Sequence, residues 1–208
     1  MCSSDLFHAG QFVTLRRPHG LRRSYSLAAP PNKQNQLELQ VRHLPGGVLS
    51  GWLCTELEIG ERVDLFGPEG SCFYLADDPT RPLLLIGTGT GLAPLMGVVR
   101  DALAQGHTGS IRLYHGSRHA DGLYLQNELN ALAAMHPNFF YTACTSVDGP
   151  RADATAFKEI PDTAGYRVYL CGHPEMIKSA QRKAFLLGAS LSDIYIDPFV
   201  RALPAPLP

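Results

Sequence analysis

The stretch from Leu83 to Val99 constrains the fold of this chain more than any other. An apolar run, Leu83–Ile86, leads into a glycine-rich turn, and an apolar helix pattern with Pro94 in its first turn follows. The turn consists of Gly87, Thr88, Gly89, Thr90 and Gly91. A buried strand, a glycine turn and a helix start bring backbone N–H groups and the positive end of a helix dipole together, which favours a bound phosphate group. A tight turn without a ligand is the alternative interpretation.

Two well-known nucleotide-binding motifs are not matched by this turn. No lysine follows the glycines, so the pattern of an ATP-binding P-loop is not met. Leu92 stands where the ordinary Rossmann fingerprint has its third glycine. The turn therefore predicts a nucleotide site that differs from both.

Strand-like and helix-like segments alternate after the polar, proline-containing stretch Asp77–Pro82. The expected strands are Leu83–Ile86, Ile111–His115, Phe139–Ala143, Arg167–Leu170 and Ile194–Ile196, and the expected helices are Leu92–Gln105, Leu123–Met135 and Pro174–Leu187. This alternation predicts a parallel sheet with helices on its faces. Ligands of such sheets bind beyond the carboxyl ends of the strands, where the glycine turn lies.

The first third of the chain has a different pattern. Short strands are expected at Gln11–Leu15, Arg23–Ala28, Leu37–His43 and Glu61–Phe66, the last ended by Gly67-Pro68, with a short helix within Val48–Leu57. Short strands separated by glycine, proline and asparagine predict a small antiparallel β-barrel. We therefore expect two domains, 1–77 and 78–200, and a disordered tail over the proline-rich residues 201–208.

Composition excludes several classes of protein. The formal net charge is −1 and only 18% of the 208 residues are charged, so no basic surface for nucleic acid is indicated. No apolar run approaches the roughly 18 residues of a membrane-spanning helix. The first ten residues, MCSSDLFHAG, lack the basic region and apolar core of a signal peptide. We expect a cytoplasmic protein that binds neither nucleic acid nor a membrane.

The cysteines argue against a metal centre. Cys2, Cys54, Cys72, Cys144 and Cys171 are widely spaced, which excludes a CxxC zinc motif and the clustered ligands of an iron–sulfur centre. His115 and His119 are four residues apart, but Gly116 and Ser117 between them favour a loop over a metal-binding helix. No metal site is expected, and the cysteines are typical of reduced thiols.

Two further motifs in the first third have the chemistry of phosphate and ring binding. Arg23-Ser24-Tyr25-Ser26 places an arginine and a tyrosine two residues apart, on one face of a strand. The guanidinium can bind a phosphate and the phenol ring can stack on a planar ligand. Gly46-Gly47-Val48-Leu49-Ser50 combines two glycines with a serine at an expected helix start, which favours an anion. A strand arginine and a plain surface turn are the alternatives.

The three motifs, in this order, resemble the ferredoxin–NADP reductase-like family of flavin oxidoreductases. The resemblance extends from about Gly10 to Val200, and the best-matching branch holds the reductase components of bacterial oxygenases and related ferredoxin or flavin reductases. It implies an FAD-binding barrel domain followed by an α/β domain that binds a pyridine nucleotide. It also implies hydride transfer from NAD(P)H to flavin N5 and a separate electron acceptor, such as a ferredoxin, an oxygenase component or free flavin.

Site residues follow from this resemblance. Ser26, Thr88 and Cys171 are implied to lie at the hydride path, near flavin N5 and the nicotinamide. Arg23 is implied to bind the FAD pyrophosphate, and Tyr25 to stack on the isoalloxazine. The cofactor-binding residues are Arg23, Ser24, Tyr25, Ser26, Gly46, Gly47, Val48, Ser50, Gly87, Thr88, Gly89, Thr90, Gly91, Ser117, Arg118, Cys171, Gly172 and Phe199. For Cys171 and Phe199, plain core packing is the alternative.

Two positions depart from or qualify the family pattern. Asp197 stands where the oxygenase branch usually has a glutamate, so its contact with the site is open. Ser117 and Arg118 could bind the 2′-phosphate of NADPH, but Ala143–Val147 lacks the Ser-Arg pair of many NADPH-specific relatives. The sequence therefore slightly favours NADH.

Only nine residues precede Gly10, whereas family members carry further barrel strands there. We expect a barrel that lacks its first strands, either because the chain is shortened or because another chain completes it. An FAD-dependent NAD(P)H reductase is the preferred interpretation. The alternatives are an electron-transfer subunit that needs a partner chain for activity, and a binding module without chemistry.

Overall fold

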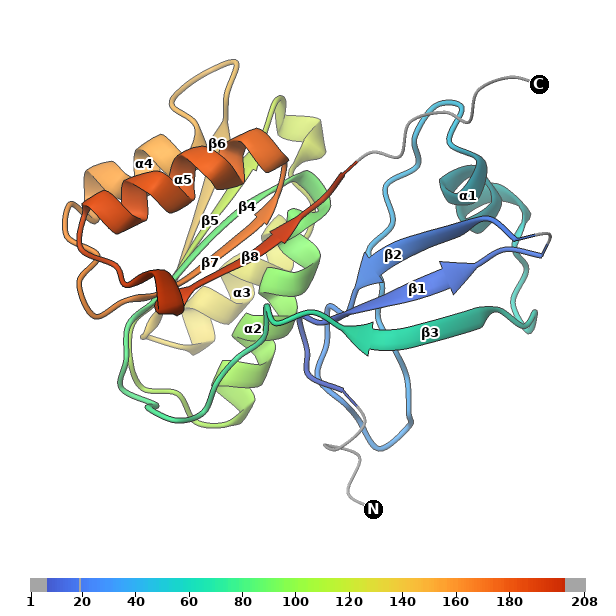
Figure 1. Cartoon of the computed structure of the whole chain (residues 1–208), viewed down its shortest axis with the longest axis horizontal. Coiled ribbons are helices and arrows are strands. Elements are labelled where there is room, and N and C mark those ends of the chain that lie inside the picture. Colours follow the sequence, from blue (N-terminus) through green and yellow to red (C-terminus); the bar gives the residue numbers. More distant parts are fainter. Residues whose placement is uncertain (1–6, 19, 201–208) are drawn as a thin grey trace.

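Two sheets organise the molecule, in a computed structural model that describes residues 7–18 and 20–200 (Figure 1). The first is antiparallel, with the order β2-β1-β3, and the second is parallel, with the order β6-β5-β4-β7-β8. Their strands are β1 (Phe12–Arg16), β2 (Arg22–Ser26), β3 (Asp64–Glu69), β4 (Leu83–Thr88), β5 (Ile111–Ser117), β6 (Phe139–Thr145), β7 (Arg167–Gly172) and β8 (Ile194–Pro198). The expected order, an antiparallel part followed by an α/β part, is confirmed.

The antiparallel sheet is built around β1, which pairs with both neighbours. Its register places Val13 opposite Tyr25 and Leu15 opposite Arg23. Leu15 packs with Leu49 and Trp52, which the short helix α1 (Val48–Gly51) and the following π-helical turn (Trp52–Glu56) hold over the sheet. This apolar contact fixes α1 to the sheet, and with it the loop that carries Gly46 and Gly47.

Two details of this half differ from expectation. Residues 37–43 do not form a strand, because their pairing is a single bridge between Leu27 and Leu39, at which Ala28 N donates to Glu38 O. Strand β3 does not end at Gly67-Pro68 but continues through them to Glu69, since Gly67 adopts a φ of +122° that keeps the pairing with β1. In the described residues the antiparallel part is a three-stranded sheet, in agreement with the expected incomplete barrel.

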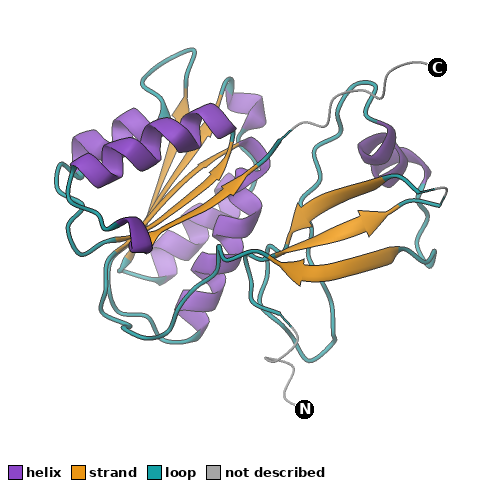
Figure 2. Ribbon diagram, viewed as in Figure 1, coloured by secondary structure: helices purple, strands orange, loops and turns teal. Residues whose placement is uncertain are grey.

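Helices cover both faces of the parallel sheet (Figure 2). They are α2 (Leu92–Ala104), α3 (Gln126–Met135), α4 (Ala152–Glu159) and α5 (Pro174–Leu186). Alternate residues of β4 point to opposite faces: Leu83 and Leu85 pack with α2 and α3, and Leu84 and Ile86 pack with α4 and α5. Helix α4 is not among the expected elements, because its apolar residues are only three alanines and Phe157 and it is only eight residues long.

Strand β5 also extends beyond its expected end, through His115 to Ser117. His115 is a buried strand residue, as expected, whereas Gly116 and Ser117 belong to the strand and not to a loop. The tail 201–208 and Cys2 lie outside the described residues, so the expectations for them stay predictions, as does the domain boundary near residue 77. No helix in residues 7–18 and 20–200 is both long and apolar enough to span a membrane.

An ion pair between a buried arginine and an exposed aspartate attaches the connection between the sheets to the parallel sheet. The side chain of Arg167, on β7, is 2% exposed and donates to both carboxylate oxygens of Asp77, at 2.9 and 2.8 Å, and to Leu75 O at 2.9 Å. The hydrogen bonds from Arg167 lower the pKa of Asp77 to about 2. The connection therefore follows a fixed path between the two sheets.

The two halves meet at the backbone of α2. A Cβ on Gly97 would lie 2.6 Å from Gly10 N, 2.6 Å from Leu27 O and 2.9 Å from Ala9 C, so only glycine fits there. One turn further on, Arg100 donates to Ala28 O and to Glu38 at 2.8 Å, and it also pairs with Glu128 on α3. Close backbone contact and a branched ion pair thus join the halves.

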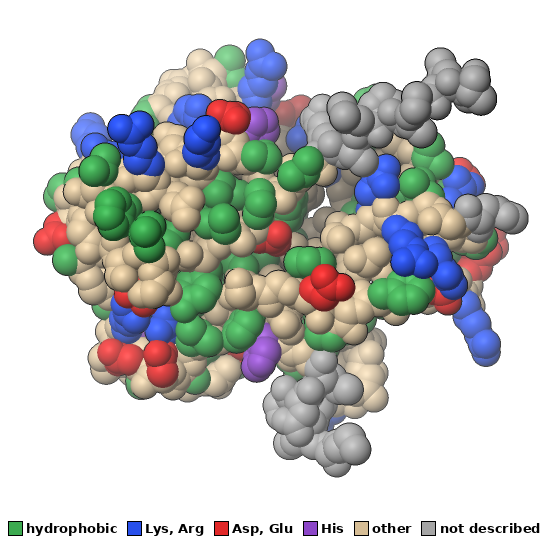
Figure 3. Space-filling view, in the orientation of Figure 1, with side chains coloured by type: hydrophobic (Ala, Val, Ile, Leu, Met, Phe, Trp, Pro, Cys, Tyr) green, Lys and Arg blue, Asp and Glu red, His purple; other side chains and the backbone are tan. Residues whose placement is uncertain are grey.

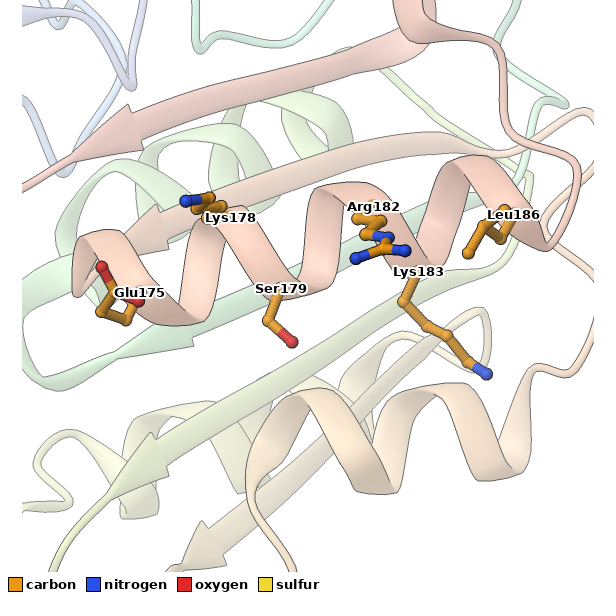
Figure 4. A pocket seen from close by; sticks show the side chains of 6 residues that line it. All are labelled: Glu175, Lys178, Ser179, Arg182, Lys183 and Leu186. Carbon is orange, nitrogen blue, oxygen red and sulfur yellow. The ribbon is translucent and has the colours of Figure 1, made fainter.

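The outward face of the parallel half carries two exposed features away from this junction. Figure 3 shows hydrophobic side chains on the face over α5 and β8, and the exposed ones of these elements include Phe185, Leu186 and Ile196. A shallow hollow along α5 is lined by Glu175, Lys178, Ser179, Arg182, Lys183 and Leu186 (Figure 4). All six residues belong to this one helix, and none of the expected site residues is among them.

Candidate functional site

The glycine turn lies at the carboxyl end of β4, between β5 and β7. Gly87 pairs in register with His115 on one side and Cys171 on the other. A Cβ on Gly91 would lie 2.4 Å from Cys171 O, so a side chain at this position would collide with the β7 backbone. The glycines are therefore needed for close packing of the turn against the neighbouring strand.

The start of α2 fits an anionic ligand. The helix has no side chain that caps its first N–H groups and no acidic residue in its first turn. Gly89 has a φ of +55°, and the nearest atom to a Cβ built on it is Arg42 Nη1, at 4.0 Å. The first N–H groups of a helix and a nearby guanidinium are the groups that bind a phosphate.

Arg42 is a candidate residue that the sequence analysis missed. It is exposed, and no carboxylate among the described residues forms an ion pair with it. Its charge is therefore free to act on a ligand at the turn. Little in the sequence points to this role, because Arg42 lies 47 positions before Gly89 in a segment expected to be an ordinary strand.

His115 holds the backbone of the glycine turn through a hydrogen bond to Gly89. Its Nε2 lies 3.2 Å from Gly89 O, so this nitrogen carries the proton and donates it. The imidazole is fully buried, and its Nδ1 has no hydrogen-bond partner among the described residues. The imidazole and Tyr124 rings meet edge to face, with their centroids 5.5 Å apart. Burial lowers the pKa of His115 to about 4, so the ring is neutral at physiological pH.

A pH-dependent stability follows from the burial of His115. An unfolded histidine has a pKa of about 6.5, so between that pH and pH 4 only the unfolded chain takes up this proton. We expect the free energy of unfolding to fall by up to about 3 kcal/mol as the pH drops through this window. Urea denaturation at several pH values measures this fall. A His115→Gln variant, which keeps a donor but does not titrate, should lose this part of the pH dependence, and an unchanged slope would contradict the assignment.

Thr88 and Gly172 close the site at the ends of β4 and β7. Thr88 Oγ1 accepts a hydrogen bond of 3.0 Å from His173 N. Gly172 has a φ of +113°, and a Cβ on it would lie 2.6 Å from both Thr88 O and Thr88 Oγ1. Gly172 O accepts a hydrogen bond of 2.8 Å from Phe199 N, just after β8. The two expected residues Thr88 and Gly172 are thus in contact, and Phe199 is attached to them through its backbone.

Cys171 is fully buried beside a second cysteine. Its Sγ lies 3.4 Å from Sγ of Cys72, which is 2% exposed and follows β3 in the chain. Burial raises the pKa of Cys171, and the hydrogen bond with Cys72 raises it further. Both cysteines are free thiols. Cys171 is therefore a neutral thiol at this site and not an activated nucleophile.

Ser26 and Asp197 connect the two sheets at the same place. Ser26 Oγ, at the end of β2, donates a hydrogen bond of 2.8 Å to Asp197 Oδ2 on β8. Asp197 is opposite Cys171 in the register of β7 and β8. Burial raises the pKa of Asp197, and the hydrogen bond from Ser26 partly counteracts this. The aspartate thus reaches Ser26 despite its shorter side chain, which answers the question that the sequence left open.

The remaining residues of the first motif lie along β2. Tyr25 is partly buried against Leu15 and Trp52, and burial raises its pKa. Arg23 is exposed, and its Nη1 donates to Arg22 O at 2.7 Å. The hydroxyl of Ser24, on the other face of the strand, contacts Thr14 Oγ1 at 3.2 Å.

The second motif forms a closed turn before α1. Gly46 has a φ of +71°, and a Cβ on Gly47 would lie 2.4 Å from Ser50 Oγ. The Ser50 hydroxyl accepts from Leu44 N at 3.2 Å and donates to Gly47 O at 3.4 Å. Ser50 is therefore used within the turn in this structure, whereas Val48 is exposed.

Ser117 and Arg118 lie at the end of β5, where the chain turns toward residues 119–122. Their carbonyl oxygens accept hydrogen bonds from Ser146 N at 3.0 Å and Val147 N at 3.3 Å. The Arg118 side chain is exposed. No group of three or more potential metal ligands occurs among the described histidines, cysteines and carboxylates.

The structure thus gathers one cluster from distant parts of the chain. Ser26, Thr88, Cys171, Gly172 and Asp197 are connected by hydrogen bonds, strand pairing or direct contact. Sequence reasoning had named all but Asp197 as site residues.

Comparison with known proteins identifies both halves of the chain. Residues 5–74 match the oxidoreductase FAD-binding domain family, and residues 85–182 match the oxidoreductase NAD-binding domain family. The two matches fall on the antiparallel and the parallel half, in the same order.

Characterised relatives are reductase components. The chain is 36% identical over 200 residues to the ferredoxin–NAD(P)+ reductase component of the naphthalene 1,2-dioxygenase/salicylate 5-hydroxylase systems of Ralstonia, with 93% of this chain and 60% of the relative covered. It is 40% identical over 190 residues to the reductase subunit of an aromatic O-demethylase of Amycolatopsis, with 86% and 56% covered.

Solved structures give the same result. The crystal structure of an Amycolatopsis cytochrome P450 reductase superposes with a TM-score of 0.84 at 36% identity, covering 93% of this chain and 61% of the other. The FAD/NAD-binding domain of a nitric oxide dioxygenase from Vibrio cholerae shares the fold, with a TM-score of 0.81 at 20% identity and coverage of 93% and 85%. The chain spans about 60% of the length of the curated relatives that it matches. It belongs to the ferredoxin–NADP reductase-like family of FAD- and NAD-binding oxidoreductases.

Proposed function

We propose that this chain is an FAD-dependent NAD(P)H reductase that passes electrons to a separate acceptor. The observation that carries the proposal is the cluster of Ser26, Asp197, Cys171 and Thr88 at the junction of the two halves. It brings polar groups of the FAD-binding half to the carboxyl ends of β4 and β7, where ligands of a parallel sheet bind. When bound there, FAD accepts a hydride from the nicotinamide and releases electrons to the acceptor.

The residues of the antiparallel half fit a bound FAD. Arg23 has no carboxylate partner among the described residues and can bind the pyrophosphate. Tyr25 presents a ring whose packing against Leu15 and Trp52 fixes its orientation for stacking. Nothing lies within 4 Å of a Cβ built on Gly46, so a phosphate can approach the backbone of the turn before α1 at this residue.

The residues of the parallel half fit a pyridine nucleotide. The uncapped start of α2 and the Arg42 guanidinium would hold its pyrophosphate above Gly89. Thr88 and Gly172 would border the nicotinamide, with the neutral thiol of Cys171 below it. Ser117 and Arg118 would lie nearer the adenosine end, and we propose NADH as the preferred nucleotide.

Catalysis by these side chains would consist of positioning and of excluding water. None of Ser26, Thr88 and Cys171 carries a charge, and the carboxyl of Asp197 is held by the hydroxyl of Ser26. Strand pairing fixes the positions of Cys171 and Asp197. The nicotinamide ring and the isoalloxazine ring would therefore meet in one orientation. For the acceptor we propose an oxygenase component, because relatives are reductase components of naphthalene 1,2-dioxygenase and phenol 2-monooxygenase systems.

The absorbance spectrum of the FAD-loaded chain tests this proposal. After removal of excess FAD, the flavin bands should remain with the protein and should bleach when NADH is added without oxygen. A Gly91→Val variant is the matched control, because its side chain would displace the nucleotide turn but leave the antiparallel half intact. Retained flavin that neither NADH nor NADPH bleaches would refute the proposal. Comparison of kcat/KM for the two nucleotides tests the preference for NADH.

A further inference from the structure

Tyr124 connects the nucleotide turn to the FAD-binding half. Its phenol donates a hydrogen bond of 2.5 Å to Oε1 of Gln40, which lies 84 positions earlier in the chain. The edge-to-face contact with His115 places the same ring against the residue that holds Gly89 O. Burial raises the pKa of Tyr124, so the phenol stays protonated and remains a donor. Tyr124 therefore touches both the support of the turn and the segment opposite it.

The segment around Gln40 depends on side chains for its position. Gln40 Nε2 donates to Glu38 Oε1 at 3.2 Å, and Arg100 holds Glu38 at 2.8 Å. The backbone of residues 41–43 forms no hydrogen bond with another described residue. The next fixed point along the chain is Leu44 N, which donates to Ser50 Oγ. Arg42 thus lies midway between two anchored residues, Gln40 and Leu44, each two positions away.

These contacts close into a ring. Gly89 O accepts a hydrogen bond from His115, His115 packs against Tyr124, and Tyr124 donates to Gln40. Arg42, two residues after Gln40, completes this ring of contacts, because its Nη1 lies 4.0 Å from the Cβ position of Gly89. Every side-chain member of the ring except Arg42 is held by another protein group. Arg42 is the member that would face the ligand.

We infer that Tyr124 is a positioning residue for the pyridine nucleotide: through Gln40 it holds residues 40–43 so that Arg42 lies over the turn at Gly89. The inference rests on the proposed function and extends it to a residue that would act on the nucleotide through Gln40 and Arg42. Without the phenol, residues 40–43 keep their attachments at the Leu39–Leu27 bridge, at Glu38 and at Leu44, but they lose the bond from Tyr124, so ordering Arg42 on the ligand costs more conformational entropy.

A double-mutant cycle with Tyr124→Phe and Arg42→Gln tests this inference on the FAD-loaded chain. The probe is ADP-ribose, which carries the pyrophosphate but cannot reduce the flavin, and its Kd is measured by calorimetry. Loss of one neutral hydrogen bond should raise the Kd by about three- to ten-fold in Tyr124→Phe. Arg42→Gln should raise it at least as much. If Tyr124 acts through Arg42, adding Tyr124→Phe to Arg42→Gln should change the Kd less than two-fold.

Controls separate positioning from a general loss of structure. Tyr141→Phe removes another buried phenol, one without a hydrogen-bond partner, and should leave the Kd unchanged. Gln40→Ala breaks the same bond from the other side and should reproduce Tyr124→Phe, with FAD retained and with KM for NADH raised more than kcat is lowered. Additive effects of Tyr124→Phe and Arg42→Gln on the Kd, or an unchanged Kd in Tyr124→Phe, would overturn this inference but leave the proposed function standing. Failure of the unmutated chain to bind ADP-ribose or NADH would overturn the proposed function together with it.

Discussion

Replacing Ser26 with alanine should lower the rate at which NADH reduces the bound flavin by about 100-fold, with FAD still retained. The hydroxyl is the group of the FAD-binding half that reaches the cluster at the ends of β7 and β8, through its 2.8 Å bond to Asp197. Alanine removes this donor and leaves the buried carboxyl of Asp197 without it, so the pKa of Asp197 rises further. The two halves then lose the Ser26–Asp197 bond, which in the proposed function would orient the nicotinamide ring against the flavin ring.

Stopped-flow reduction under anaerobic conditions measures the rate, and retained flavin absorbance confirms that the cofactor site is intact. Thr14→Val is the matched control, because this hydroxyl contacts Ser24 on the other face of the antiparallel sheet and Thr14 is not among the expected site residues. It should reduce the rate less than two-fold. A Ser26→Ala variant with an unchanged reduction rate would show that the cluster does not take part in hydride transfer.

Replacing Gly97 with valine should lower the free energy of unfolding by about 3 kcal/mol. The new side chain would begin within 3 Å of three backbone atoms, from Ala9, Gly10 and Leu27, and backbone cannot move aside as a flexible side chain can. For a chain of this size, such a loss corresponds to a fall in Tm of roughly 6–12 °C. Thermal unfolding followed by circular dichroism measures it.

Gly149→Ala is the control for this substitution. A Cβ there would be 3.9 Å from Thr145 O, which is ordinary contact, so the Tm should change by no more than about 2 °C. Equal stability of Gly97→Val and the unmutated chain would mean that α2 and the antiparallel half do not meet as closely as described.

Local patterns predicted much of the parallel half. The runs Leu83–Ile86 and Arg167–Leu170 are bounded by glycines and polar residues, and each became a buried strand of the sheet. Thr88 and Cys171 could be placed together because carboxyl ends of adjacent parallel strands share one edge. Periodicity misled at residues 37–43, where the alternation is that of a strand but a single bridge to Leu27 is the only pairing.

Contacts between distant residues could not be predicted. The bond of Ser26 to Asp197 spans 171 positions, and the contact of Cys72 with Cys171 spans 99. No periodicity or spacing encodes such pairs, because they depend on how the two halves pack. Arg42 was missed for the same reason, since its significance lies in its proximity to Gly89.

The packing of α2 on the other half also determines how the molecule can move. Opening of two domains requires a boundary at which backbone segments can separate or slide, as at a hinge. Here the backbone of Gly97 lies against Ala9, Gly10 and Leu27, with no side chain between them to accommodate sliding. We therefore expect the two halves to move as one rigid body on the time scale of turnover. Nucleotide entry and release would then depend on local motion of exposed segments such as residues 41–43 and 118–122, and not on domain closure.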